Sequence, residues 1–220
     1  MKIVIVSAHP DDETLGMGGT ILKLKKTENQ LIWILVTIPE LKKDREKVNR
    51  YIKRITKFYN YDDFYWLKFP VTKLGYENLS DLILQFRKIF IKINPEIVFT
   101  VSDTDIHSDH LFTYKGILSS LKPFRENNLI SILKYEVLSS THIFPSNLQI
   151  FKPNVFSDIT DYIDTKIKAF QLFEKEIQPL PFPRNAETIK ALSRLRGSSC
   201  GVMYAEAFEL VFGRLTCLQI

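Results

Sequence analysis

The chain has 220 residues, of which 45% are hydrophobic and 25% are charged, as in an ordinary globular protein. It shows no signal peptide and no apolar stretch approaching the roughly 20 residues of a membrane helix, so we expect a cytoplasmic protein without a membrane segment. The formal net charge is +5, but the lysines form no basic stripe interleaved with aromatic residues, so nucleic-acid binding is not expected.

The first half of the chain alternates predicted strands with predicted helices. Four apolar runs lack polar alternation, as strands buried on both faces of a parallel sheet do; they cover residues 2–7, 31–37, 64–69 and 97–101. Apolar residues at helical spacing between and after these runs predict helices over about 18–26, 48–59, 79–93 and 109–121. This order predicts an α/β fold with a mostly parallel sheet and helices on both faces.

The second half of the chain is less regular. We expect strands over 132–137 and 207–212, and helices over 161–177 and 186–196, with a proline-rich loop at 179–183. There is no internal repeat, no low-complexity tract and no convincing linker. The sequence therefore predicts a single domain over residues 1–220.

Residues 8–13 read Ala-His-Pro-Asp-Asp-Glu and follow directly on the first predicted strand. An imidazole and three carboxylates crowded at the end of a buried strand are unfavourable unless something binds them, and a divalent metal suits them best. His9 and Asp12 offer the nitrogen and oxygen ligands that zinc accepts. The glycines at 16–19 do not have the spacing of a dinucleotide-binding loop, and the acidic run before them would repel a pyrophosphate.

The third ligand is expected from a second motif, His-Ser-Asp-His at residues 107–110, which comes after the fourth predicted strand. The chain has four histidines, and three of them fall in these two motifs. In an open parallel sheet, ligands bind outside the carboxyl ends of the strands, where the strand order reverses. If the first and fourth strands are neighbours there, His9, Asp12 and His110 converge on one ion with a position left for water or substrate.

The remaining polar residues of the two motifs then fit the roles of a hydrolase. Asp11 can act as general base toward the metal-bound water, and His107 can stabilise an oxyanion or protonate the leaving nitrogen. Asp109 can accept a hydrogen bond from an imidazole and fix its tautomer. Zinc makes hydroxide available at neutral pH, so the motifs predict metal-assisted hydrolysis of an amide or similar acyl bond.

Taken together, these residues resemble the PIG-L / LmbE-like zinc-dependent deacetylases. The resemblance rests on residues 8–20 and 107–110, and continues at 135–137, at 157–159 with Lys166, at 183–184 and at 196–208. It implies a Rossmann-like fold and N-deacetylation of N-acetylglucosamine-type substrates. It also implies the following site: metal ligands His9, Asp12 and His110, base Asp11, and the auxiliary pair His107 and Asp109.

The sequence departs from that family in two loops that border the predicted site. Residues 37–40 read Thr-Ile-Pro-Glu where many members have glycine in place of the proline, and residues 182–185 read Phe-Pro-Arg-Asn instead of a segment ending in Pro-Arg-Ser. The identity of the substrate is what these loops leave open. Substrate-contact candidates are Glu13, Tyr135, Arg184 and Arg196. For each arginine a salt bridge within the fold is an equal alternative, and for Tyr135 the alternative is a buried structural contact.

The predicted function is that of a zinc-dependent N-deacetylase whose partner is a small N-acetylated amino sugar or conjugate, with iron(II) as the alternative metal. The oligomeric state stays open. Two other functions compete with this prediction: hydrolysis of another acyl amide at the same metal site, and non-catalytic binding of a sugar or nucleotide by a Rossmann-like module. Asp11 argues against the binding module, because such a module has no use for a carboxylate beside the metal ligands.

Overall fold

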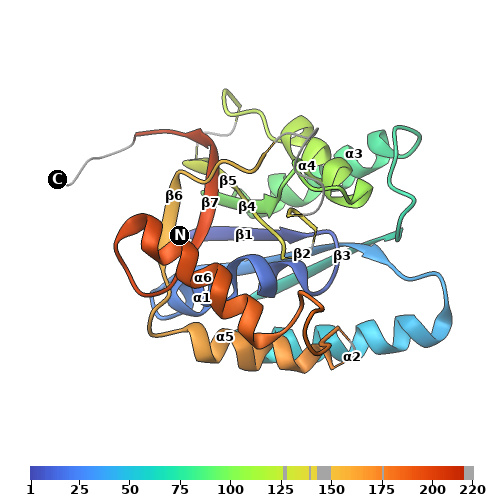
Figure 1. Ribbon diagram of the computed structural model, residues 1–220. Helices are drawn as coiled ribbons and strands as arrows, with labels where there is room; N and C mark the ends of the chain where they lie inside the picture. Colours follow the sequence, from blue (N-terminus) through green and yellow to red (C-terminus); the bar gives the residue numbers. More distant parts are fainter. Residues whose placement is uncertain (126–127, 139, 143–149, 175, 216–220) are drawn as a thin grey trace.

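The computed structural model describes residues 1–125, 128–138, 140–142, 150–174 and 176–215 (Figure 1). Its strands are β1 (Lys2–Ser7), β2 (Gln30–Ile38), β3 (Asp63–Pro70), β4 (Ile97–Val101), β5 (Ser131–Tyr135), β6 (Val155–Asp158) and β7 (Ala205–Gly213). Its helices are α1 (Asp12–Lys25), α2 (Lys42–Tyr59), α3 (Leu79–Ile93), α4 (Ser108–Ser120), α5 (Ile163–Phe170) and α6 (Ala186–Cys200), with a short 3-10 turn η1 (Gln171–Phe173).

The strands form one seven-stranded sheet in the order β3-β2-β1-β4-β5-β7-β6. The first five strands pair in parallel, and β7 and β6 add in antiparallel orientation. The predicted mostly parallel α/β sheet is therefore confirmed. Strand β1 lies between β2 and β4, so the strand order reverses there, and the first and fourth strands are neighbours, which is the condition for the expected convergence of His9, Asp12 and His110. An α/β fold binds its ligand outside the carboxyl ends of the strands at the point where the strand order reverses.

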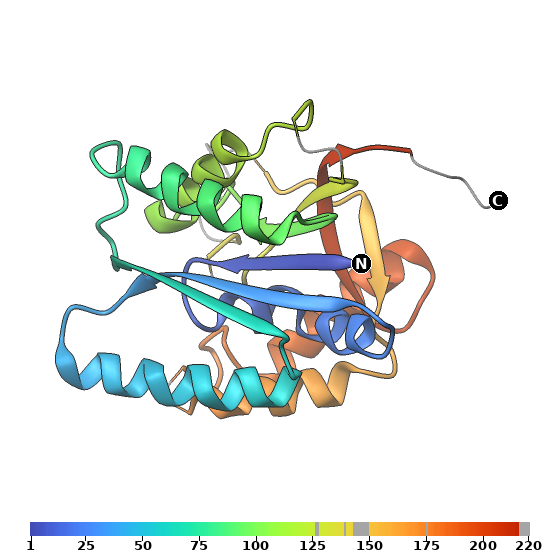
Figure 2. The same cartoon turned by 180° about the vertical axis from the view of Figure 1, so that it is seen from behind.

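Helices cover both faces of the sheet. Helices α3 and α4 lie on one face, and α1, α2, α5 and α6 lie on the other, as the two opposite views show (Figures 1 and 2). Strand β1 is buried on both faces because its side chains alternate between two cores: Ile3 and Ile5 pack into one, and Val4 and Val6 into the other. An unbroken apolar run is what such a strand requires.

Helix α1 begins at Asp12, six residues earlier than predicted, and kinks at Met17, where φ is −145°. The glycines in this segment made its early start hard to predict, because glycine weakens a helix. Close packing explains why one of them is needed: a Cβ on Gly16 would lie 2.2 Å from Cδ2 of Tyr135. Beyond the kink, the Glu206 carboxylate accepts from the backbone N–H groups of Gly19 and Thr20 and so replaces hydrogen bonds that the kink removes.

The second half of the chain differs more from the prediction. Strand β6, at Val155–Asp158, was not expected, because four residues are too few to show a clear periodicity. The single helix predicted over 161–177 is shorter: α5 ends at Phe170 and continues only as η1 to Phe173. No helix among the described residues is both long enough and apolar enough to span a membrane.

Candidate metal centre and active site

The segments that follow β1 and β4 bring three predicted ligands together: His9 lies in the loop before α1, Asp12 begins α1, and His110 lies in the first turn of α4. Nε2 of His110 lies 3.2 Å from Nδ1 of His9 and 3.3 Å from Oδ2 of Asp12. Nδ1 of His9 and Oδ2 of Asp12 are 3.7 Å apart. His9 and His110 are 101 residues apart in the sequence. In the fold, these two histidines and Asp12 direct two nitrogen atoms and one oxygen atom at a common point.

This donor set fits a divalent metal. In a tetrahedral zinc site with bonds of about 2.0–2.1 Å, neighbouring ligand atoms lie roughly 3.3–3.4 Å apart, close to the separations of 3.2 and 3.3 Å around His110. The other carboxylate oxygen of Asp12, Oδ1, is buried without a hydrogen-bond partner among the described residues. Imidazole nitrogen and carboxylate oxygen suit zinc and iron(II) alike. The geometry therefore indicates a metal site but does not distinguish between these two metals.

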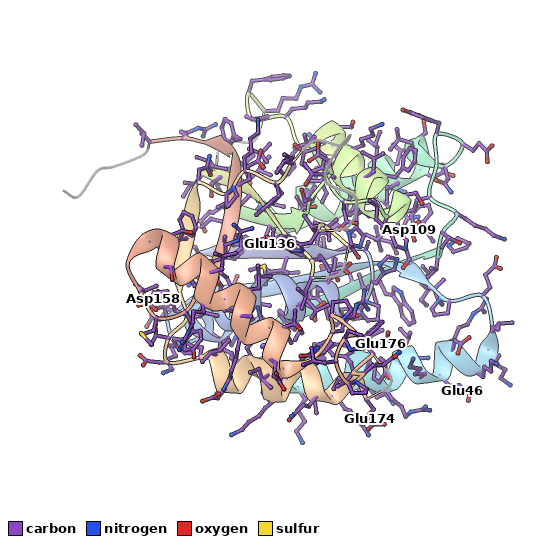
Figure 3. The ribbon with its side chains drawn as sticks, in the orientation of Figure 1. Glu46, Asp109, Glu136, Asp158, Glu174 and Glu176 are labelled. Atoms are coloured by element: carbon purple, nitrogen blue, oxygen red, sulfur yellow. The ribbon has the colours of Figure 1, made fainter. Side chains whose placement is uncertain are left out.

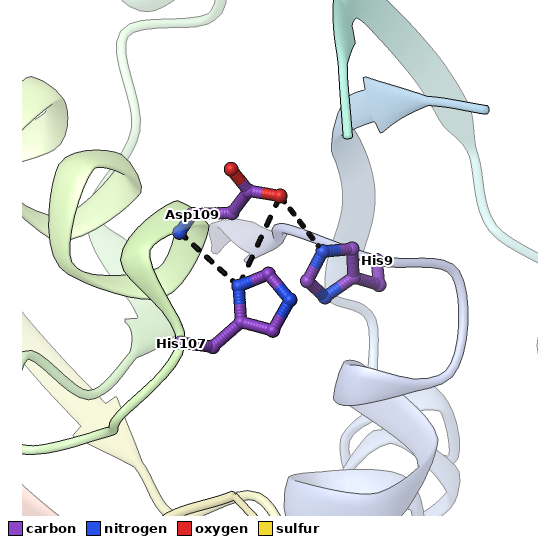
Figure 4. A group of neighbouring side chains, drawn as sticks. All are labelled: His9, His107 and Asp109. Carbon is purple, nitrogen blue, oxygen red and sulfur yellow. Dashed lines mark hydrogen bonds and ion pairs between the residues drawn. The ribbon is translucent and has the colours of Figure 1, made fainter. Parts of the chain in front are cut away.

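Two further carboxylates orient the imidazole rings. Oδ2 of Asp109 lies 3.1 Å from Nε2 of His9 (Figure 4), and Oδ2 of Asp105 lies 2.9 Å from Nδ1 of His110. In each ring the carboxylate faces the nitrogen that points away from the shared site. A proton held on that nitrogen leaves the lone pair of the other nitrogen directed at the metal position. Carboxylates behind the ligating histidines of zinc proteins fix the tautomer in the same way.

The Asp109 carboxylate is itself fixed by a loop. Backbone N–H groups of Thr72 and Leu74, in the loop after β3, donate to its two oxygens at 2.8 and 3.4 Å. Thr72 has a φ of +64°, an uncommon conformation for a residue with a Cβ, and the N–H group of Thr72 bonds Oδ2 in this conformation. Three strand-end loops, after β1, β3 and β4, therefore build the site together.

The carboxylates also set the charge of the candidate ligands. Burial disfavours a charged His9, but hydrogen bonds to Asp109 and Asp12 raise its pKa to about 9. Burial acts the same way on His110, and Asp12 and Asp105 raise its pKa to about 10. Burial opposes the ionised form of Asp12, yet His110 and His9 hold its pKa well below the usual range. A metal that binds here replaces imidazole protons, so binding is coupled to proton release.

Asp11 lies beside the metal group in a cavity of roughly 300 Å³ that it lines together with His9, His107 and Arg184. Nη1 of Arg184 donates to Oδ2 of Asp11 at 2.7 Å. Burial raises the pKa of Asp11, and the guanidinium of Arg184 opposes that rise. Of the two predicted arginines, Arg184 thus reaches the site, and its partner there is Asp11, so it forms the salt bridge within the fold that was the alternative to binding substrate.

His107 lies at the same cavity and is held as a hydrogen-bond donor toward it. Its Nδ1 accepts from the backbone N–H of Asp109 at 3.2 Å (Figure 4). Burial, with the nearby His9 and His110, lowers its pKa, which favours the neutral ring. A neutral imidazole that accepts at Nδ1 carries its proton on Nε2, so His107 offers an N–H group.

Three predicted substrate contacts do not reach the cavity. Glu13 and Tyr135 are both fully buried: the Glu13 carboxyl accepts from Thr14, and the Tyr135 hydroxyl donates to the backbone carbonyl of Val6. Glu13 turns inward because helix α1 starts at Asp12. Arg196 pairs with Glu136 through two hydrogen bonds of 2.8 and 2.6 Å, the arrangement of a structural salt bridge. The geometry does not support substrate contact for any of them.

Sequence reasoning missed several residues that the structure places at the site. Asp105 lies two residues before the second motif, and only its proximity to His107 and His110 in the sequence could have indicated it. Lys47 and Glu176 line the cavity but come from α2 and from the segment after η1. No motif marks either residue, so the sequence alone carried no signal for them.

Comparisons with known proteins agree with this geometry. The family model described as PIG-L, GlcNAc-PI de-N-acetylase, matches residues 4–121. The diacetylchitobiose deacetylase of Thermococcus kodakarensis is 22% identical, and the match covers 96% of this chain and 84% of that protein. The probable N-acetyl-alpha-D-glucosaminyl L-malate deacetylase 2 of Bacillus anthracis is 24% identical, with coverage of 77% and 78%.

The fold is shared with solved structures over almost the whole chain. The N,N'-diacetylchitobiose deacetylase of Pyrococcus horikoshii superposes with a TM-score of 0.73 at 23% identity, covering 99% of this chain and 86% of that one. At this level of identity the likeness concerns the fold, whereas the matched family model includes both metal-site motifs.

Proposed function

The chain belongs to the PIG-L family of GlcNAc-PI de-N-acetylases, and on that basis we propose that it is a metal-dependent hydrolase that removes the acetyl group from an N-acetylated amino sugar or its conjugate. The proposal is supported by relatives that are named as deacetylases of N-acetylglucosamine-containing compounds. The observation that carries it is the convergence of His9, Asp12 and His110 beside a cavity that His9 lines together with Asp11 and His107.

His9 Nδ1, Asp12 Oδ2 and His110 Nε2 would hold the metal, with zinc proposed and iron(II) as the alternative. A bound metal of this kind supplies a Lewis acid that polarises a carbonyl oxygen and acidifies water. Asp109 and Asp105 keep the two imidazole rings in the orientation that presents these nitrogens. Their contacts with the rings, at 3.1 and 2.9 Å, hold the two donor nitrogens in place within the fold before any metal binds.

Asp11 is proposed as the general base. Its carboxylate is held at the cavity by Arg184 and is next to a proposed ligand in the sequence without belonging to the three-atom donor group. It can therefore take a proton from the attacking water and later deliver that proton to the leaving nitrogen, as an acid–base residue does in amide hydrolysis. The salt bridge to Arg184 restricts the carboxylate to one position, which favours proton transfer over a short, fixed path.

His107 is proposed to stabilise the oxyanion that forms as the acetyl carbonyl is attacked. Its Nδ1 is occupied by the backbone N–H of Asp109, so the N–H on Nε2 is the group available to the substrate oxygen. A preorganised donor of this kind lowers the energy of the charge that develops in the transition state. The general-acid role is the less favoured one for His107, because burial and the nearby His9 and His110 keep its pKa low.

The direct test is release of acetate from N,N'-diacetylchitobiose by the purified protein. We expect equal amounts of acetate and free amine from the zinc-loaded or iron(II)-loaded protein, loss of both after treatment with a chelator, and recovery on adding the metal back. Turnover that survives complete metal removal would contradict the proposal. Acetate release from other amides only, with none from any N-acetylated sugar, would contradict the proposed substrate class.

A further inference from the structure

The wall of the cavity beside the metal group carries charges that the proposed chemistry does not use. Lys47 comes from α2, Glu176 follows η1, and Arg184 precedes α6; all three line the cavity together with Asp44. Figure 3 places Glu176 closer to the sheet than its neighbour Glu174. Segments far apart in the sequence therefore meet at this wall, and each brings a charged side chain to it.

These charges are paired with one another. Nζ of Lys47 lies 2.9 Å from Oε1 of Glu176, and Nη1 of Arg184 lies 3.6 Å from Oε2 of the same carboxylate. The other partner of Arg184 is Asp11, at 2.7 Å. Glu176 thus bridges the lysine and the arginine of the cavity, so each of these cations already has a carboxylate of the chain as its partner.

We infer that this wall selects an uncharged N-acetylated sugar over an anionic conjugate, and that Glu176 is the residue responsible for the selection. The inference rests on the proposed function and narrows its substrate class. A carboxylate or phosphate on the substrate would have to displace Glu176 from Lys47 and Arg184. It would also meet Asp44 and Asp11, since carboxylates outnumber lysine and arginine among those lining residues that the structure describes.

A neutral saccharide meets no such opposition. Sugar hydroxyl groups donate hydrogen bonds, and hydrogen bonds to ionised carboxylates are stronger than those between neutral groups. Asp44 and Glu176 offer acceptors for them without any ion pair being replaced. Specificity arises here as much from unfavourable charge against the anionic competitor as from contacts with the neutral substrate.

The test compares two ligands that share one sugar: methyl N-acetylglucosaminide, which is neutral, and N-acetylglucosaminyl L-malate, which is anionic. The dissociation constant of each is measured by calorimetry on the metal-loaded protein. We expect the wild type to favour the neutral ligand at least tenfold, and Glu176→Gln to reduce this preference at least fivefold. Glu174→Gln serves as the matched control, because Glu174 pairs with Arg54 and is not among the lining residues.

A second variant tests the ion pair of Lys47 and Glu176 by removing the lysine. Lys47→Met leaves the Glu176 charge less compensated and should shift the preference further toward the neutral ligand, whereas Lys43→Met, on the exposed side of α2, should not. Equal or tighter binding of the malate conjugate by wild type, an unchanged ratio in Glu176→Gln, or no binding of either ligand would overturn the inference. Acetate release is assayed separately, so failure of the deacetylase proposal is seen independently of the charge preference.

Discussion

Oδ2 of Asp105 lies 2.9 Å from Nδ1 of His110, on the opposite side of the ring from the Nε2 that faces His9 and Asp12. Asp105 also accepts from the backbone N–H of His107 at 3.0 Å. One buried carboxylate therefore fixes both histidines of the second motif, one through its ring and the other through its backbone.

Replacing this carboxylate should weaken metal binding without removing a ligand. We expect Asp105→Asn to lower zinc affinity about 10–100-fold, the usual effect of losing an orienting carboxylate behind a ligating histidine. Competition against a chromophoric chelator measures the affinity directly. Asp103→Asn is the control: Asp103 pairs with Lys134 at 2.7 Å and should leave the affinity unchanged. Equal affinities for the two variants would exclude the role given to Asp105.

Asp11→Asn separates metal binding from turnover. The substitution preserves the size of the side chain but removes the proton acceptor, so we expect turnover to fall by roughly 10²–10⁴-fold, as for loss of a general base. Metal content should stay near that of the wild type, because Asp11 is outside the donor group. Rates of acetate release and elemental analysis of the same preparation make the comparison. Near-normal turnover in this variant would remove Asp11 as the base.

The buried pair Lys166 and Glu206 is expected to be structural. The Glu206 carboxylate accepts from Lys166, from the Thr20 hydroxyl and from two backbone N–H groups beyond the kink of α1. Glu206→Gln leaves the ammonium group of Lys166, a residue that is 3% exposed, without its counter-charge. We expect a loss of about 3–5 kcal/mol in the free energy of unfolding, measured by urea denaturation.

The double variant Lys166→Met with Glu206→Gln is the control for that interpretation. It removes the unpaired charge, so it should recover part of the loss, and the two substitutions should be strongly non-additive. Additive losses in the single and double variants would show that the ion pair itself contributes little to stability.

The pair of Glu136 with Arg196 should make stability depend on pH. Burial favours a protonated Glu136, but hydrogen bonds from His142 and Arg196 hold its pKa below its ordinary value of 4.5. A lowered pKa stabilises the fold above the ordinary value, and this stabilisation is lost as the pH falls through the lowered pKa. Glu136→Gln should therefore be less stable than wild type at neutral pH, by roughly 1–3 kcal/mol.

Urea denaturation at several pH values tests the sign of this effect. The difference between wild type and Glu136→Gln should shrink as the pH falls from about 4.5 through the lowered pKa, where the carboxyl of the folded wild type becomes protonated. Glu187→Gln, an exposed position at the start of the same helix as Arg196, should show no such dependence. A difference that stays constant across this range would contradict the assignment.

The sequence allowed the parallel core and the proposed metal ligands to be predicted, for a specific physical reason. Strands buried on both faces need unbroken apolar runs, so β1 and β4 are visible in the sequence, and the loops after neighbouring parallel strands must end at one edge. His9, Asp12 and His110 could be placed together from that rule alone. Short strand β6 and the early start of α1 could not be predicted, because four residues show no period and glycines obscured the helix.

The surroundings of the metal group were beyond reach of the sequence. Glu176 and Thr72 contribute through irregular segments, where no periodicity predicts which side chain or N–H group faces the site. Glu13 illustrates the opposite error. It belongs to the motif and was expected at the substrate. Glu13 follows Asp12 on α1, however, and its side chain points into the core, where it is fully buried.

If His9, Asp12 and His110 hold one metal ion, the metal content of the protein depends on each of them. Elemental analysis is made on wild type, on His110→Ala and on His142→Ala, which removes the histidine that contacts Glu136 instead of the metal group. We predict about one zinc or iron per chain in wild type and in His142→Ala, and almost none in His110→Ala. Wild-type protein that binds no metal after reconstitution with either ion, or His110→Ala that retains a full equivalent, would contradict the account.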